Sequence, residues 1–239
     1  MENMYEKTDE DIEKIKKKVK KLRLPNKLIA MPNPDKKFHE HWDDNRNMLN
    51  IPHPYRLVCV GKPNVGKTTV VKNLLLRARP EFEEVFVIHC DGGYTKEYKD
   101  IDTEILDHIP PPDSWEGLVK TLVIIDDLDL TNLSKEQKGN LDRLFGYCST
   151  HKNISVVLCS QNFTNVPPIA RRCANFFVIW KTNDMDAMSG VGRKSGLKPD
   201  KFKSIFYNDM KGHRDSLWID LTDGSPYPVR KNGFEVIEY

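Results

Sequence analysis

The stretch that most constrains this chain is residues 61–68, which read Gly-Lys-Pro-Asn-Val-Gly-Lys-Thr. It follows the apolar run 56–60 and precedes a helix-like stretch from Thr69 to Arg79. Two glycines at this spacing let the backbone wrap around a phosphate with its N–H groups pointing inward, and the following helix adds the positive end of its dipole. The pattern G-x-x-x-x-G-K-T between a strand and a helix therefore predicts a cradle for the phosphates of a nucleotide.

The residues of this cradle have separate expected roles. Lys67 would reach the β and γ phosphates, and the Thr68 hydroxyl would ligate Mg²⁺. We expect the nucleotide to be held by consecutive residues of the motif and the start of its helix: Gly61, Lys62, Pro63, Asn64, Val65, Gly66, Lys67, Thr68 and Thr69.

A second motif is the apolar run 121–125 followed by Asp126 and Asp127. A short run too apolar to alternate predicts a strand buried on both faces, as in a parallel sheet. Ligands of such sheets bind at the carboxyl ends of the strands. We expect Asp126 to hold Mg²⁺ through water, and Asp127 to orient and deprotonate the water that attacks the γ-phosphate. The alternative is an Asp-rich turn, since Asp129 and the pair Thr-Asn at 131–132 follow.

Two further elements complete the predicted site. The apolar strand 154–160 ends at Gln161, whose amide would sense the γ-phosphate or the attacking water; the alternative is an ordinary surface glutamine. The short helix expected after Val166 carries Arg171 and Arg172 near its end. One of them would act as an arginine finger on a neighbouring subunit's nucleotide. Alternatively, these arginines cap helix carbonyls or bind DNA phosphate.

The order of these motifs, ending in Pro-x-x-x-Arg-Arg-x-x-Asn before another apolar run, carries a family resemblance. Residues 54–231 resemble the genome-packaging ATPases of large double-stranded DNA viruses, virophages and Polinton-like elements, within the FtsK-HerA superfamily. Much of that superfamily has Asp-Glu where this chain has Asp126 and Asp127, so the second carboxylate lies about one methylene further back.

The resemblance implies an α/β P-loop NTPase with a mainly parallel core sheet flanked by helices and a small C-terminal β addition. It implies ATP as nucleotide with Mg²⁺, and hydrolysis coupled to translocation of double-stranded DNA. The implied partners are duplex DNA, further copies of the chain in a homo-oligomeric ring, and a viral capsid or portal-vertex protein. The implied place of action is the host cell cytoplasm or a viral factory, with association with the virion.

Charge is unevenly distributed, although the net charge is only +2. We expect an amphipathic helix over 1–24. Residues 14–27, which overlap its second half, hold eight basic residues and no acid, and this favours contact with DNA or an acidic partner over a merely solvated face. A proline-containing arm over 25–53 would join this helix to the ATPase domain, 54–239. The stretch Gly190 to Lys198 reads as a glycine-rich basic loop that either follows a phosphate backbone or is a flexible surface loop.

Composition excludes several classes of protein. Hydrophobic residues make up 38% of the 239 and charged residues 30%, typical of a folded globular domain. The longest apolar runs have five or six residues, too short for a membrane span, and the first residues do not resemble a signal peptide. Of five scattered cysteines, Cys59, Cys90 and Cys159 lie on expected core strands, so we expect buried free thiols.

Two rival functions remain open at this level. The sequence of the cradle is similar to that of Era-like GTPases, but the guanine-binding motif Asn/Thr-Lys-x-Asp is missing from the sequence. The partial matches at 26–29 and 95–98 lack its aspartate. The other rival is a nucleotide-binding scaffold that assembles on DNA or capsid without turnover. The intact set of predicted catalytic residues argues against it.

Overall fold

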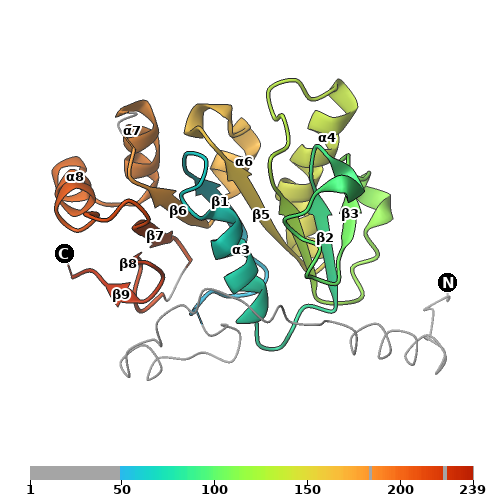
Figure 1. Ribbon diagram of the computed structural model, residues 1–239, viewed down its shortest axis with the longest axis horizontal. Coiled ribbons are helices and arrows are strands. Elements are labelled where there is room, and N and C mark those ends of the chain that lie inside the picture. Colours follow the sequence, from blue (N-terminus) through green and yellow to red (C-terminus); the bar gives the residue numbers. More distant parts are fainter. Residues whose placement is uncertain (1–48, 183–184, 223–224, 239) are drawn as a thin grey trace.

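The computed structural model describes residues 49–182, 185–222 and 225–238 (Figure 1). The expected N-terminal helix over 1–24, and nearly all of the arm over 25–53, lie outside these residues. Those two predictions therefore stay predictions.

The described chain is built around one nine-stranded sheet with the strand order β3-β2-β4-β5-β1-β6-β7-β8-β9. The strands from β3 to β6 run parallel to their neighbours, whereas β7, β8 and β9 pair antiparallel. This confirms the expected parallel core with a small C-terminal β addition. The bounds are β1 Arg56–Val60, β2 Glu84–Ile88, β3 Glu104–Leu106, β4 Thr121–Ile125, β5 Ile154–Ser160, β6 Phe176–Trp180, β7 Ser216–Asp220, β8 Val229–Lys231 and β9 Glu235–Val236.

Helices cover both faces of this sheet. Alternate residues of β1 point into two separate cores: Leu57 packs with α3, and Val58 packs with residues of α4, α7 and α8. In Figure 1, α3 crosses the front of the sheet. The helices are α3 Lys67–Leu76, α4 Lys135–Arg143, α5 Ser149–His151, α6 Pro168–Cys173, α7 Met185–Lys194 and α8 Pro199–Asn208; single turns are η1 Gly92–Tyr94, η2 Pro112–Ser114, η4 Phe163–Asn165 and the π-turn η3 Leu144–Cys148.

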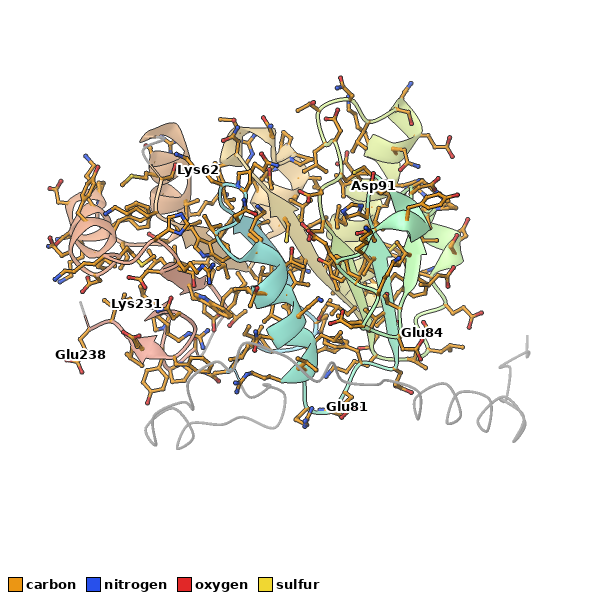
Figure 2. All side chains as sticks on the ribbon, viewed as in Figure 1. Lys62, Glu81, Glu84, Asp91, Lys231 and Glu238 are labelled. Atoms are coloured by element: carbon orange, nitrogen blue, oxygen red, sulfur yellow. The ribbon has the colours of Figure 1, made fainter. Side chains whose placement is uncertain are left out.

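The register of the central strands places the predicted motifs at one edge. β4 lies between β2 and β5, with Ile125 opposite both Ile88 and Leu158, and β5 separates β4 from β1. Because these strands are parallel, the segments that follow them leave the sheet at the same edge. Figure 2 shows Lys62 and Asp91 at this edge, and Glu81 and Glu84 at the opposite one.

Two predictions about local structure were wrong. Residues 190–194 are not a loop but the second half of α7, and the irregular segment is only 195–198. A Cβ on Gly190 would collide with the ring of Phe163, and one on Gly192 would lie 2.9 Å from Phe202. These glycines therefore allow a helix to pack closely, not a backbone to flex. 

The second wrong prediction concerns Cys90. β2 ends at Ile88, so Cys90 lies beyond the strand and is exposed, whereas Cys59 and Cys159 are buried as expected. The described cysteines are all free thiols.

The packing of α7 predicts that Gly190→Ala destabilises the fold by about 1–3 kcal/mol, because the added methyl group overpacks against Phe163. Gly139→Ala is the matched control. Gly139 also lies in a helix, α4, but a Cβ there meets nothing within 4 Å, so alanine should stabilise by about 0.5–1 kcal/mol. Urea unfolding followed by circular dichroism measures both. Equal stability of Gly190→Ala and wild type would contradict this packing account.

Candidate nucleotide and metal site

A cavity of about 740 Å³ opens at the carboxyl edge of the sheet. It brings together most of the residues predicted from sequence, which come from three separate segments: Pro63 to Thr69 of the cradle, Asp126 and Asp127 after β4, and Gln161 after β5. The motifs are thus parts of one site.

The cradle has the backbone geometry that its glycines allow. Gly66 has a φ of 110° and forms the N-cap of α3, in the left-handed region that glycine adopts without strain. A Cβ on Gly61 would lie 2.8 Å from both Trp180 and Val65, so the backbone approaches its neighbours too closely for any other residue. The first N–H groups of α3 have no intrahelical acceptor and are available to an anion.

Lys67 is held inside the cradle by backbone carbonyls. Its Nζ donates to the oxygens of Gly61 at 2.9 Å and Lys62 at 3.1 Å, and the residue is only 8% exposed. Gly61 and Lys62 do not themselves line the cavity; their carbonyls hold the lysine that does. Within the part of the chain that the structure describes, the Lys67 ammonium has two neutral acceptors and no carboxylate partner, so it can face a phosphate.

The two predicted metal ligands lie in contact. The Thr68 hydroxyl donates to Oδ2 of Asp126 at 3.2 Å, although the residues come from α3 and the end of β4. Asp126 is 1% exposed, and its N–H donates to the Ile88 carbonyl at 3.0 Å, which continues the β2–β4 pairing by one residue. A hydroxyl and a carboxylate beside a phosphate cradle are the hard oxygen donors that Mg²⁺ prefers, so these residues fit the ion.

Tyr98 fixes the carboxylate of Asp126 from the other side. Its hydroxyl donates to Oδ2 at 2.6 Å, and the side chain is fully buried. Burial raises the pKa of the Tyr98 phenol well above its ordinary value, and the neighbouring Asp126 carboxylate raises it further. The phenol therefore keeps its proton and remains a donor.

Asp127 and Gln161 both reach the cavity as exposed residues. Asp127 has a φ of 49°, so the chain leaves the extended conformation there and the carboxylate turns out of the strand. Gln161 follows Ser160, whose carbonyl accepts the Gly61 N–H at 3.1 Å and ties the end of β5 to the cradle. Neither role predicted for these side chains is tested by this geometry.

The predicted finger arginines lie elsewhere. Arg171 and Arg172 are in the last turn of α6 and do not line the cavity. The Arg171 guanidinium lies 5.5 Å from the ring centroid of Phe163, and Arg172 is exposed.

Sequence reasoning missed two parts of the site. Glu97 and Tyr98 come from the segment between β2 and β3, which carries no motif. One wall of the cavity is formed by the C-terminal strands, with Arg214 and Asp215 just before β7, Ser216 at its start and Asn232 after β8. Asn232 holds this wall together, since its Oδ1 accepts the Ser216 N–H at 3.0 Å.

The strand order, the cradle and the cavity together define the fold of a P-loop NTPase. Among solved structures, the chain is similar to B204, the DNA-packaging ATPase from Sulfolobus turreted icosahedral virus: 14% identity over 78% of this chain and 100% of that chain, with a TM-score of 0.55. It is also similar to the genome-packaging NTPase B204 from Sulfolobus turreted icosahedral virus 2 in complex with ATP-gammaS, at 15% identity over 74% and 96% with a TM-score of 0.52.

A third similar structure is the pCW3 conjugation coupling protein TcpA in its monomer form with ATPgS, at 15% identity over 87% of this chain and 70% of that chain, with a TM-score of 0.51. No protein-family model matches the chain, and no curated protein matches it in sequence. The resemblance to viral genome-packaging ATPases is thus confirmed at the level of the fold. Among the described helices, none is long and apolar enough to cross a membrane.

The contact between Tyr98 and Asp126 predicts a stability difference between two buried tyrosines. Tyr98→Phe should cost about 1–3 kcal/mol, because the substitution removes a donor from a buried carboxylate. Tyr55 is also buried, but its hydroxyl has no hydrogen-bond partner among the described residues, so Tyr55→Phe should be neutral or stabilising. Urea unfolding compares the two. A loss of stability in Tyr55→Phe equal to that in Tyr98→Phe would contradict the assignment.

Proposed function

We propose that this protein is an ATP-hydrolysing motor that translocates double-stranded DNA and packages a viral genome into its capsid. The observation that carries the proposal is the contact of Thr68 with Asp126, at 3.2 Å, inside a cavity that also contains Lys67, Asp127 and Gln161. This set contains a phosphate cradle, a metal pair and exposed groups at the γ-phosphate end. A scaffold without turnover requires only the cradle.

In this proposal each side chain has one task. The cradle N–H groups and Lys67 bind the β and γ phosphates of ATP. Thr68, and Asp126 through water, would hold Mg²⁺, which would supply neutralisation of the charge that develops on these phosphates. Asp127 orients the attacking water and accepts its proton, and the Gln161 amide contacts the γ-phosphate or that water.

Three features support a DNA motor in a ring. The fold is similar to that of two viral packaging ATPases and of a conjugation coupling protein. The basic segment 14–27 offers charge for DNA phosphates. Arg171 and Arg172, which do not line their own cavity, are available to a neighbour's nucleotide. A ring of copies would surround the duplex and dock on a capsid or portal-vertex protein, in the host cytoplasm or a viral factory and on the virion.

Substitutions in the cavity test hydrolysis. Lys67→Ala should abolish turnover and greatly weaken ATP binding, because it removes the cation held at the β/γ phosphates. Asp127→Asn should bind Mg-ATP normally but lose about 10²- to 10⁴-fold in kcat. Asp129→Asn is the matched control: among the described residues this exposed carboxylate accepts hydrogen bonds from its own turn alone, at Thr131 and Asn132, and turnover should be unchanged. Wild-type turnover in Asp127→Asn would refute its role.

Mixing two inactive variants in the same assay tests whether an arginine finger acts between subunits. Arg171→Ala/Arg172→Ala and Asp127→Asn should each be inactive alone. Mixed in equal amounts with duplex DNA, they should recover part of the activity, because some interfaces then pair an intact carboxylate with an intact finger. A mixture as inactive as its components would remove the argument for a finger acting between subunits.

A further inference from the structure

The γ-phosphate end of the cavity holds a third carboxylate, which belongs to no sequence motif. Oε2 of Glu97 lies 3.2 Å from the Thr68 hydroxyl, the same distance as Oδ2 of Asp126. One hydroxyl proton can serve only one of these acceptors at a time. Two carboxylates that share one hydroxyl are therefore arranged to receive a further donor or a cation.

The position of Glu97 is fixed by its neighbours. Tyr98, the next residue, is fully buried and bonds Asp126, and Thr95, two residues earlier, is 4% exposed. Asp100 forms an ion pair of 2.8 Å with Lys72 of α3. Glu97 is thus an exposed side chain on a segment anchored to both the metal aspartate and the cradle helix.

Glu97 also lies beside Asp127. Their carboxylate oxygens and a ring nitrogen of His89 all lie within 4.8 Å of one another. His89 follows β2 and is 5% exposed, and its Nδ1 accepts the Asp91 N–H at 3.1 Å. The imidazole of His89 therefore lies next to both carboxylates at this end of the cavity.

The lengths of the two side chains suggest a division of work. The side chain of Glu97 is one methylene longer than that of Asp127. It comes from the segment between β2 and β3, and its carboxylate lies within 4.8 Å of that of Asp127 in the lining of the same cavity. We propose that Glu97 is a further catalytic carboxylate, which holds the attacking water jointly with Asp127. The inference rests on the proposed function, because it assigns the water to the same ATP site.

The step is ordinary hydrolysis. The water oxygen forms a bond to the γ-phosphorus as the bond from that phosphorus to the β,γ-bridging oxygen breaks, and ADP leaves with that electron pair. One water proton stays on the inorganic phosphate, and the other passes through the carboxylate pair to solvent. Glu97 contributes as an acceptor that fixes the direction of the water, which matters more in the transition state than for binding of ATP.

The test compares Glu97→Gln and Glu97→Asp with wild type and with Glu104→Gln. Glu104 is an exposed glutamate of β3 that does not line this cavity, so its variant should behave as wild type. Both Glu97 variants should lose about 10²-fold or more in kcat, with a Kd for Mg-ATP within about threefold of wild type, as expected when only transition-state contacts are lost. Glu97→Asp keeps the negative charge but shortens the side chain. A loss of kcat in this variant would therefore show that the length of the glutamate side chain is required.

Two readouts exclude a merely structural effect. The urea midpoints of the Glu97 variants should match that of wild type. Aluminium fluoride with ADP mimics the transferring phosphoryl group, so binding of this complex should weaken while binding of Mg-ADP alone does not.

The double variant Glu97→Gln/Asp127→Asn tests whether the two residues act as one unit. Its loss in kcat should be less than the product of the losses in the two single variants.

The outcomes separate this inference from the proposed function. A wild-type protein that hydrolyses ATP, with Glu97→Gln within about threefold of it in kcat, overturns the inference alone. If the Glu97 variants bind Mg-ADP and the aluminium fluoride complex equally more weakly than wild type, the inference is also overturned, since Glu97 would then only support the cradle. A wild-type protein that hydrolyses no ATP, with or without duplex DNA, overturns the proposed function.

Discussion

The contact on which the site depends is the hydrogen bond between Thr68 and Asp126. Thr68 lies in the first turn of α3, which follows β1, and Asp126 follows β4, so the bond joins segments that follow two strands separated by β5. Parallel pairing of β1 with β5 and of β5 with β4 sets both residues at one edge. A shift of one residue in either pairing would turn the side chains of the shifted strand to the other face and separate the metal pair from the cradle.

The charges around this contact are arranged for a ligand. Asp126, Asp127 and Glu97 line one end of the cavity, while the Lys67 ammonium points to backbone carbonyls and not to any of them. Tyr98 supplies a neutral donor to the most buried carboxylate. The site thus has negative charge where a divalent cation would bind and positive charge where phosphates would bind, and among the described residues no salt bridge joins Lys67 to these three carboxylates.

The C-terminal strands complete the cavity. Trp180 at the end of β6 lies against Gly61, so the strand beside β1 determines how closely the cradle can approach the sheet. Beyond it, Ser216 and Trp218 of β7 line the same cavity. The small antiparallel addition is therefore part of the candidate site as well as an extension of the sheet.

How much could be predicted from the sequence depended on the range of the interactions involved. The cradle and the paired acids were predictable because each is a local pattern attached to a strand, and parallel pairing then brings their ends together. Glu97 was not, because its place depends on burial of Tyr98 against Asp126, which no local spacing records. Gly190 was misread because the reason for a glycine there is the ring of Phe163, far away in the sequence.

The most direct test of the central claim is ATP-driven movement along DNA. A linear duplex carries a third strand bound as a short triplex, and displacement of that strand is followed after wild-type protein and Mg-ATP are added. The account predicts displacement with ATP, and none with a nonhydrolysable analogue, without Mg²⁺ or with Lys67→Ala. Hydrolysis of ATP by the wild type on this DNA without displacement of the third strand would contradict the motor and leave an ATPase of another kind.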